Sequence, residues 1–86
     1  MINNNENNKI FAHLVTEIID NKYDIQATYS MTECNDNWSN LSIIFNTNLH
    51  DCLVTVSINY KTQVIYKLVE DISIRIDKQI LNSYLK

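Results

Sequence analysis

The segment Cys52–Tyr60, CLVTVSINY, decides how this chain is interpreted, because its side chains alternate strictly between two classes. Cysteine, β-branched and aromatic residues take the even positions, and mostly polar residues take the odd ones. A sustained period of two predicts a β-strand with one buried face. The alternation breaks at residues 61–62 and resumes over residues 64–68, so we predict a β-hairpin over residues 52–69.

Two more strands and one helix are predicted ahead of this hairpin. Asp24–Glu33 and Leu41–Thr47 alternate in the same way. Lys9–Asn21 instead has apolar residues at spacings of three and four, which predicts an amphipathic helix. Its apolar stripe consists of Ile10, Phe11, Leu14, Val15, Ile18 and Ile19. Met1–Asn8 is rich in asparagine and has no periodicity, so we predict a disordered N-terminus there and one domain over residues 9–86.

The C-terminal segment admits two interpretations. Ile72, Ile74 and Ile76 alternate as in a strand. On a helical wheel, however, Val69–Lys86 sorts into a wide apolar arc and a polar sector, and its early acids and final lysine suit the helix dipole. We predict a helix. The resulting order is α-β-β-β-β-α, an α+β fold in which a four-stranded antiparallel meander has two helices packed on one face.

The composition narrows the function classes. The chain has 86 residues, a formal charge of -3, and neither glycine nor proline. Abundant Asn, Ile, Lys and Tyr with scarce Arg and Ala indicate an AT-rich genome. The absence of glycine excludes Gly-rich phosphate loops and nucleophile elbows. Where a turn needs a left-handed backbone conformation, we expect Asn or Asp to adopt it. The acidic balance argues against direct contact with nucleic acid through phosphates.

The cysteines and the hydropathy predict a compartment. Cys34 and Cys52 do not make a disulfide framework. We find no signal-peptide pattern and no apolar run of membrane-spanning length. We therefore expect a cytoplasmic protein with reduced thiols and no membrane contact.

Reactive residue types are densest at His50, Asp51 and Cys52. A cysteine nucleophile needs a base within reach and a partner that orients this base. In a strand Asp51 would point away from the other two, and Cys52 begins an apolar alternation, so we interpret Cys52 as a small buried hydrophobic residue. Cys34, His50 and Cys52 are three scattered potential zinc ligands, whereas a structural zinc site uses four. We expect no enzymatic activity, no metal and no cofactor.

The predicted outward face of the sheet is polar but almost uncharged, with Ile44, Leu53 and Ile65 as apolar points. Such a face can dock a partner protein through hydrogen bonds. The alternative is an ordinary solvated face whose lack of charge reflects the coding bias. Its polar members are Gln26, Thr28, Ser30, Thr32, Ser42, Asn46, Thr55, Ser57, Asn59 and Gln63.

Trp38 is a second candidate contact residue, because it lies in a polar loop near Glu33 and Asp36. Tryptophan is enriched among interface hot spots, although an aromatic residue in such a loop can also fold back onto the core. We predict that Trp38 is an apolar anchor and that Glu33 and Asp36 meet a basic surface.

Three functions follow as hypotheses. The first is a small acidic inhibitor or accessory protein of a phage or mobile element, which occupies the basic surface of a larger protein or nucleoprotein complex that handles nucleic acid or acts in defence. The second is a homodimeric chaperone or adaptor that holds an extended client, because the last helix has a wide apolar arc and Ile74, Leu81 and Leu85 would form its dimer interface. The third is a small-molecule binder between the sheet and the helices.

Overall fold

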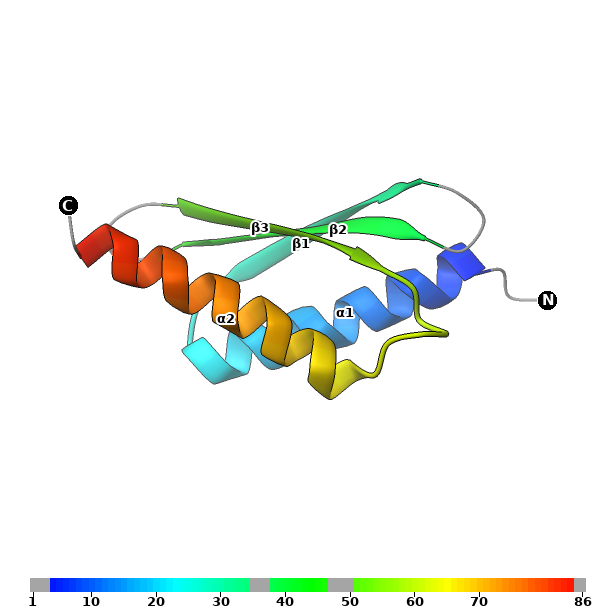
Figure 1. The fold of residues 1–86 in the computed structure, drawn as a ribbon, viewed down its shortest axis with the longest axis horizontal. Coiled ribbons are helices and arrows are strands. Elements are labelled where there is room, and N and C mark those ends of the chain that lie inside the picture. Colours follow the sequence, from blue (N-terminus) through cyan, green and yellow to red (C-terminus); the bar gives the residue numbers. More distant parts are fainter. Residues whose placement is uncertain (1–3, 35–37, 47–50, 85–86) are drawn as a thin grey trace.

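The computed structural model of this chain describes residues 4–34, 38–46 and 51–84. Helix α1 (Asn4–Tyr23) precedes strands β1 (Ala27–Glu33), β2 (Ser39–Asn46) and β3 (Asp51–Ile58), and helix α2 (Ile65–Tyr84) follows them. The sheet order is β1-β2-β3, and both neighbouring pairs are antiparallel. Both helices lie on the same side of the sheet (Figure 1). The predicted α+β class, with two helices on one face of an antiparallel meander, is therefore confirmed.

The predicted fourth strand is wrong, since the described chain forms a sheet of three strands and α2 begins at Ile65. An apolar pattern as short as that of residues 64–68 fits both the period of a strand and the period of a helix. The helical pattern of the longer segment that follows decides the structure. As a helix, it brings Leu68, Ile72 and Ile76 to one buried stripe. The predicted order α-β-β-β-β-α is therefore replaced by α-β-β-β-α.

Asn59 directs the chain out of the sheet after β3. This residue is buried, and its side-chain oxygen accepts a hydrogen bond from the Lys61 N–H at 2.9 Å. Its backbone oxygen accepts from the N–H groups of Thr62 and Gln63, both at 3.1 Å. These bonds favour a compact turn toward the helical layer over a hairpin.

Helix α1 begins at Asn4, whereas we predicted disorder through residue 8 and a helix from Lys9. Asn8 is buried within this helix. Its Nδ2 donates to Ser39 Oγ at 3.1 Å, and its Oδ1 accepts from the Tyr60 N–H at 2.9 Å. These two partners are 31 and 52 positions away in the chain. Distant contacts therefore order a segment whose local sequence shows no periodicity.

Helix α1 also turns a different face to the sheet than predicted. Ile10, Leu14 and Ile18 are 55%, 40% and 41% exposed. The buried positions are Asn8, Phe11, Ala12, Val15, Thr16 and Ile19. Two of them are polar, and Thr16 satisfies its hydroxyl by donating to the Ala12 carbonyl oxygen at 2.8 Å. The predicted buried face of α1 was therefore rotated toward solvent, because it was drawn from apolar residues alone and left out the buried polar residues Asn8 and Thr16.

The turn from α1 to β1 uses an aspartate where glycine is usual. Asp24 has a φ of 50°, in the left-handed region. The Ile25 N–H donates to the Asp20 carbonyl oxygen at 3.2 Å, which closes a Schellman-type helix end. The prediction that Asn or Asp supplies left-handed backbone is confirmed at this turn. Residues 35–37 and 47–50, where we expected other turns, lie outside the described residues.

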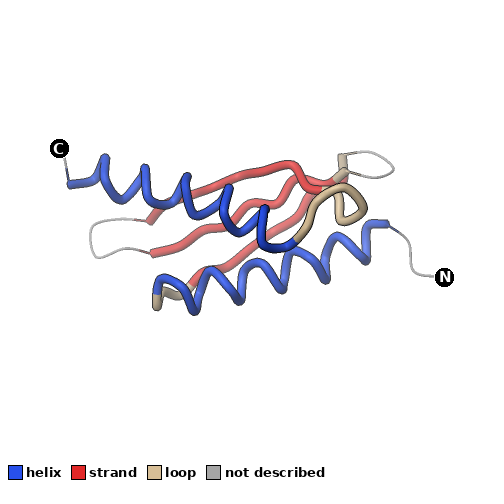
Figure 2. Tube along the Cα trace, turned by 60° about the horizontal axis from the view of Figure 1, so that its bottom comes forward, coloured by secondary structure: helices blue, strands red, loops and turns tan. Residues whose placement is uncertain are grey.

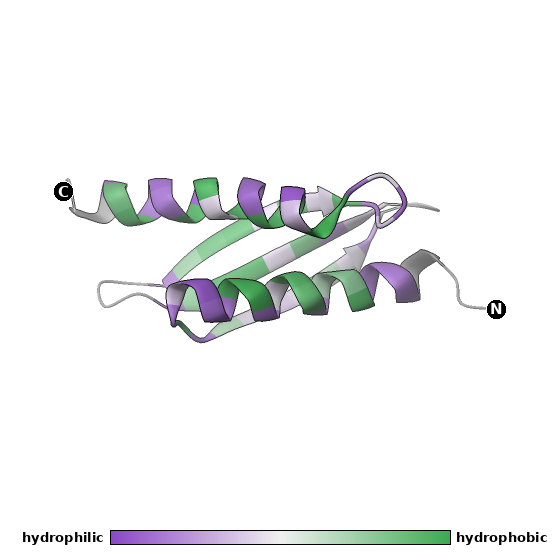
Figure 3. Cartoon of the chain, turned by 90° about the horizontal axis from the view of Figure 1, so that it is seen from below, coloured by the Kyte–Doolittle hydropathy of each residue, from purple (hydrophilic) through white to green (hydrophobic). Residues whose placement is uncertain are grey.

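The core lies between the sheet and the helical layer (Figure 2). Seen from the helical side, α1 and α2 run across the sheet, with their apolar residues mixed among polar ones (Figure 3). The buried members of the core are Phe11, Ala12, Val15, Ile19, Leu41, Ile43, Phe45, Cys52, Val54, Ile58, Leu68, Ile72 and Ile76. Neither described helix combines the length and hydropathy needed to cross a bilayer.

Candidate functional site

The face of the sheet opposite the helices carries mostly small uncharged side chains in regular rungs, and Asp51 adds one exposed carboxylate at the start of β3. Read across β1, β2 and β3, three successive rungs are Thr32–Asn40–Ser57, Ser30–Ser42–Thr55 and Thr28–Ile44–Leu53. Ser42 and Thr55 share a hydrogen bond at 3.0 Å, and Ser57 Oγ donates to Asn40 Oδ1 at 3.0 Å. In the described chain no helix lies over this face (Figure 1). We call these nine residues the bare face.

Ile44 and Leu53 form one apolar point on the bare face. They are directly opposite each other in the β2–β3 register and are 48% and 55% exposed. Cross-strand neighbours of this kind lie about 5 Å apart at Cβ, so the two side chains form one patch. The predicted grouping of these two residues is therefore present.

The third predicted apolar point, Ile65, is not on this face. It is half-buried at the start of α2 and packs against the core, because the chain has already left the sheet. Asn59 and Gln63 are also absent from the face, since both belong to the turn that follows β3. We predicted these three residues on the sheet face because we expected a hairpin over residues 52–69. In the structure a turn and helix α2 follow β3 instead.

Trp38 and Glu33 lie at the opposite end of the strands from Ile44. Trp38 is 38% exposed just before β2, and Glu33 is exposed at the end of β1. At roughly 3.3 Å per residue, Ile44 lies about 17 Å further along β2 than Ser39. The predicted contact residues therefore do not form one cluster. Asp36 lies outside the described residues.

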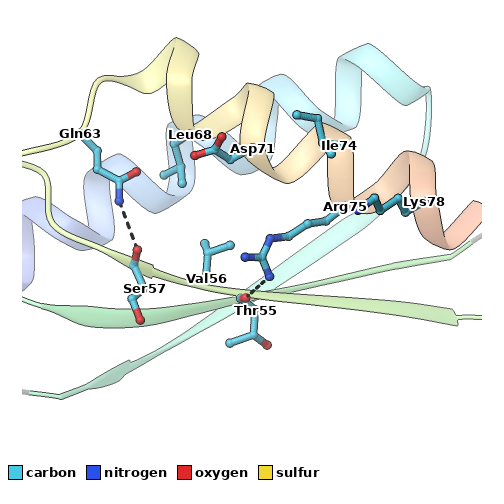
Figure 4. Close-up of a pocket in the computed structure, with 9 residues that line it drawn as sticks. All are labelled: Thr55, Val56, Ser57, Gln63, Leu68, Asp71, Ile74, Arg75 and Lys78. Carbon is cyan, nitrogen blue, oxygen red and sulfur yellow. Dashed lines mark hydrogen bonds between the residues drawn. The ribbon is translucent and has the colours of Figure 1, made fainter.

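The free edge of β3 is closed by side chains. Gln79 Nε2 donates to the Leu53 carbonyl oxygen at 2.7 Å, and Arg75 Nη1 donates to that of Thr55 at 3.3 Å. Gln63 Nε2 donates to the Ser57 carbonyl oxygen, also at 3.3 Å. Figure 4 shows Arg75 and Gln63 reaching down to the strand. The outward carbonyls of Leu53, Thr55 and Ser57 are thus occupied, which hinders the addition of a further strand at this edge.

The free edge of β1 differs from that of β3. The hydrogen bonds on β3 show that the backbone C=O groups of its odd-numbered residues point away from β2. According to the two strand registers, the backbone N–H and C=O groups of the odd-numbered β1 residues also point away from β2; these residues are Ala27, Tyr29, Met31 and Glu33. Asp20 Oδ1 accepts from the Ala27 N–H at 2.6 Å. In the described chain, the outward N–H and C=O groups of Tyr29 and Met31 have no hydrogen-bond partner. We call this stretch the open edge.

A groove of about 370 Å³ runs between α1 and the open edge. His13 lines this groove; its Nε2 lies 3.3 Å from Glu17 Oε1, and its ring centroid is 6.2 Å from that of Tyr29. Glu17 and Asp20 are the carboxylates of the groove, and no lysine or arginine lines it among the described residues. The lining consists of His13, Thr16, Glu17, Asp20, Ala27, Thr28 and Tyr29.

A larger groove of about 820 Å³ lies between β3 and α2 (Figure 4). Asp71, Arg75 and Lys78 give it charges of both signs. Arg75 already binds the Thr55 carbonyl, and Gln63 Oε1 is buried without a hydrogen-bond partner in the described chain. This groove is where the predicted small-molecule site would lie.

Cys52 is placed as a core residue. It is 3% exposed, and burial raises the pKa of its thiol, with a further rise from the nearby negative charge of Asp51. A raised pKa disfavours the thiolate, the nucleophilic form. Asp51 is exposed on the other face, and His50 lies outside the described residues. Among the described residues no three His, Cys, Asp or Glu side chains are arranged to hold a metal ion.

Two of the predicted dimer residues, Ile74 and Leu81, are 50% and 57% exposed on α2. α1 covers a different flank of α2, where Lys22 Nζ donates to Ser73 Oγ at 3.0 Å and the Tyr23 hydroxyl lies 2.8 Å from an Asp77 carboxylate oxygen. α1 therefore does not cover Ile74 and Leu81. Leu85 lies outside the described residues.

Comparisons of this chain with protein-family models, with curated protein sequences and with solved structures found no match. The surfaces described above are thus the basis for assigning a function.

The open edge and its groove were missed by sequence reasoning. A signal was present, because residues 27–33 contain no lysine and no proline, the residues that commonly protect an edge strand. The predicted meander already placed this strand at an edge of the sheet, but the backbone groups that point outward follow only from the register with β2.

Proposed function

We propose that this chain is a non-catalytic binding protein that uses the bare face of its sheet to occupy a surface of a larger protein. The observation that supports this proposal most strongly is the Ile44–Leu53 patch within a lattice of small neutral side chains. Burying such side chains costs less desolvation than burying lysines or carboxylates. The cores of protein interfaces are likewise depleted in charge.

The size of the bare face limits how the partner binds. Three strands spaced about 4.8 Å apart, each about 17 Å long over the five residues that the rungs span, give roughly 240 Å². A standard interface buries about 800 Å² on each partner. The contact therefore extends beyond the bare face, either toward Trp38 and Glu33 at one end of the strands or across the edge of β1.

The partner we propose is a larger cytoplasmic protein or nucleoprotein complex with a basic surface. The formal charge of -3 supports this choice, as do the exposed acids Glu17, Asp24 and Glu33 on the α1 and β1 side. Opposite charge speeds association more than it deepens affinity. The small size and AT-rich composition favour an inhibitor or accessory factor of a phage or mobile element.

The test is an affinity capture with matched variants. The tagged protein is incubated with nuclease-treated lysates of AT-rich bacteria, and bound proteins are quantified by mass spectrometry. The variant Ile44→Thr with Leu53→Thr keeps strand-forming side chains and removes the patch. We expect it to lose the proteins that the parent chain retains, whereas Leu81→Thr, which alters an exposed leucine on α2, keeps them. Equal recovery by both variants would refute the bare face as the binding site.

A second candidate function, a homodimeric chaperone or adaptor, is favoured by the exposure of Ile74 and Leu81 on α2. Light scattering after size exclusion tests it. A concentration-independent dimer that becomes a monomer in Leu81→Glu would support this function, and a monomeric parent chain would remove it. No specific observation favours the small-molecule hypothesis over these two.

A further inference from the structure

We propose that the open edge of β1 binds an extended segment of the partner by strand addition, and that this segment has lysine or arginine at alternate positions. This inference rests on the proposed function, because it specifies the binding mode and the chemistry of the partner.

The hydrogen-bonding capacity of the open edge fits one extended segment. Tyr29 and Met31 each present an outward N–H and an outward C=O, so one added strand can form four main-chain hydrogen bonds with them. The register with β2 is unbroken from Ala27 to Glu33, so no bulge distorts the edge. Bulges, prolines and lysines are the usual protection of an edge strand, and β1 has none of these. Strand addition is the binding mode that such an edge supports.

The groove beside the open edge would receive alternate side chains of the added strand. Residues that pair across neighbouring strands place their side chains on the same face. Tyr29 and Met31 face the helical layer and pack against the core. The residues opposite them would therefore project toward the helical layer, and the residue opposite Tyr29 would meet the groove, where Glu17 and Asp20 lie. Carboxylates at that position favour lysine or arginine among these alternate residues.

The wider charge distribution agrees with a basic segment. Asp24 and Glu33 flank the two ends of β1 and are exposed. Lys9 and His13, one helical turn apart, are the basic residues described on this side of α1, because Lys22 reaches over to Ser73. The remaining described bases lie on α2 or in the turn before it. The β1 side of the molecule is therefore net negative.

A second copy of this chain is a poorer occupant of the open edge. Pairing β1 with the β1 of another copy would bring the same carboxylates, Glu17 and Asp20, toward each other's sheet edge. Like charges close together across a strand pair destabilise it. A basic segment instead places complementary charges there.

The inference is tested first with peptides. One peptide of about nine residues, a usual strand length, has lysine at every second position with threonine and valine between. The second peptide has the same composition with its lysines consecutive, so the total charge is equal. We expect the alternating peptide to bind at least about tenfold more tightly, the change that 1.4 kcal/mol produces. Equal affinity for both peptides would overturn the inference, because it would show attraction by charge alone.

Protein variants locate the site. Met31→Pro removes an outward N–H but leaves the bonds between β1 and β2 intact, since the even residues of β1 make those bonds. Glu17→Lys reverses a groove charge at an exposed position, and Glu70→Lys makes the same change on the exposed side of α2. We expect Met31→Pro and Glu17→Lys to lose at least about tenfold in affinity for the alternating peptide, and Glu70→Lys to lose less than about threefold. If Glu17→Lys and Glu70→Lys behave alike, the groove is not the site, and this comparison holds even if Met31→Pro does not fold.

Two further outcomes separate this inference from the proposed function. If captured proteins are lost by the Ile44→Thr, Leu53→Thr variant but kept by Met31→Pro and Glu17→Lys, the open edge is not used and the proposed function stands. If all of these variants retain them, the proposed function fails as well. A parent dimer that Met31→Pro converts to a monomer would also overturn the inference, because a second copy would then occupy the edge.

Discussion

Arg75 of α2 donates a hydrogen bond from Nη1 to the carbonyl oxygen of Thr55 on β3, at 3.3 Å. The helix that covers the core therefore also closes one edge of the sheet, together with Gln79 and Gln63. The opposite edge has no such cover at Tyr29 and Met31 in the described chain. This asymmetry directs any strand addition to β1.

Removing the two α2 donors should open the second edge. In Arg75→Met with Gln79→Met, the long side chains keep their apolar stems but the carbonyls of Thr55 and Leu53 lose their partners. We expect a small loss of stability, below about 2 kcal/mol for two solvent-exposed bonds. We also expect new concentration-dependent association in sedimentation velocity, because an unpaired strand edge recruits other chains. The control is Lys78→Met, which lines the same groove and bonds to no β3 carbonyl among the described residues; identical sedimentation of the two variants would contradict this role of α2.

The buried amide of Asn8 should be important for stability. Asn8→Ala removes the hydrogen bonds that the Asn8 amide makes with the Ser39 hydroxyl and the Tyr60 N–H. We expect the free energy of unfolding to fall by about 1–3 kcal/mol, because two hydrogen bonds of about 1 kcal/mol each are lost. Denaturant unfolding measures it, and Asn21→Ala, at an exposed position of the same helix, should change it by less than about 0.5 kcal/mol. Similar losses in both variants would mean that Asn8 does not connect α1 to the sheet.

The success and the errors of the sequence analysis have one physical origin. Alternation over Ala27–Glu33 and Ser39–Asn46 is a local signal, and both strands were found. Residues 64–68 satisfy two periods at once, so the decision depends on packing that local sequence does not contain. The start of α1 depends likewise on Asn8, whose partners are distant in the chain.

The two cysteines should differ sharply in reactivity. Cys34 is exposed, whereas Cys52 is buried and its thiol pKa is raised by burial and by the charge of Asp51. We expect one thiol of the native protein to react quickly with an alkylating reagent at neutral pH, and peptide mapping should locate it at Cys34. Both thiols should react once denaturant is added. Fast native labelling of Cys52 would contradict its placement in the core.

Tyr23 should make stability depend on alkaline pH. Burial raises the pKa of its phenol, Ser73 lowers it, and the carboxylate of Asp77 raises it again. The folded chain then keeps a proton that the unfolded chain loses near pH 10, so stability falls as pH rises above this value. Tyr23→Phe should flatten this decline in denaturant titrations between about pH 9 and 11. If the stability of the variant declines with the same slope, titratable groups other than Tyr23 cause the decline.

The candidate contact residues show the same limit of sequence reasoning. Ile44 and Leu53 were grouped correctly because each lies on a strand whose alternation is unambiguous. Ile65 was misplaced together with the predicted fourth strand. The open edge at Tyr29 and Met31 was missed because it depends on which backbone groups the register with β2 leaves outward and on what α2 covers, and both emerge only in the folded chain.

The most direct test of this account is residue-resolved amide hydrogen exchange along β1, measured by NMR with and without the alternating-lysine peptide. In the free protein we predict fast exchange at Tyr29 and Met31, and slow exchange at Thr28, Ser30 and Thr32, whose N–H groups point to β2. Adding the peptide should slow exchange at Tyr29 and Met31. Protection of these two amides in the free protein, or unchanged exchange when the peptide is bound, would contradict the proposal that this edge receives a partner strand.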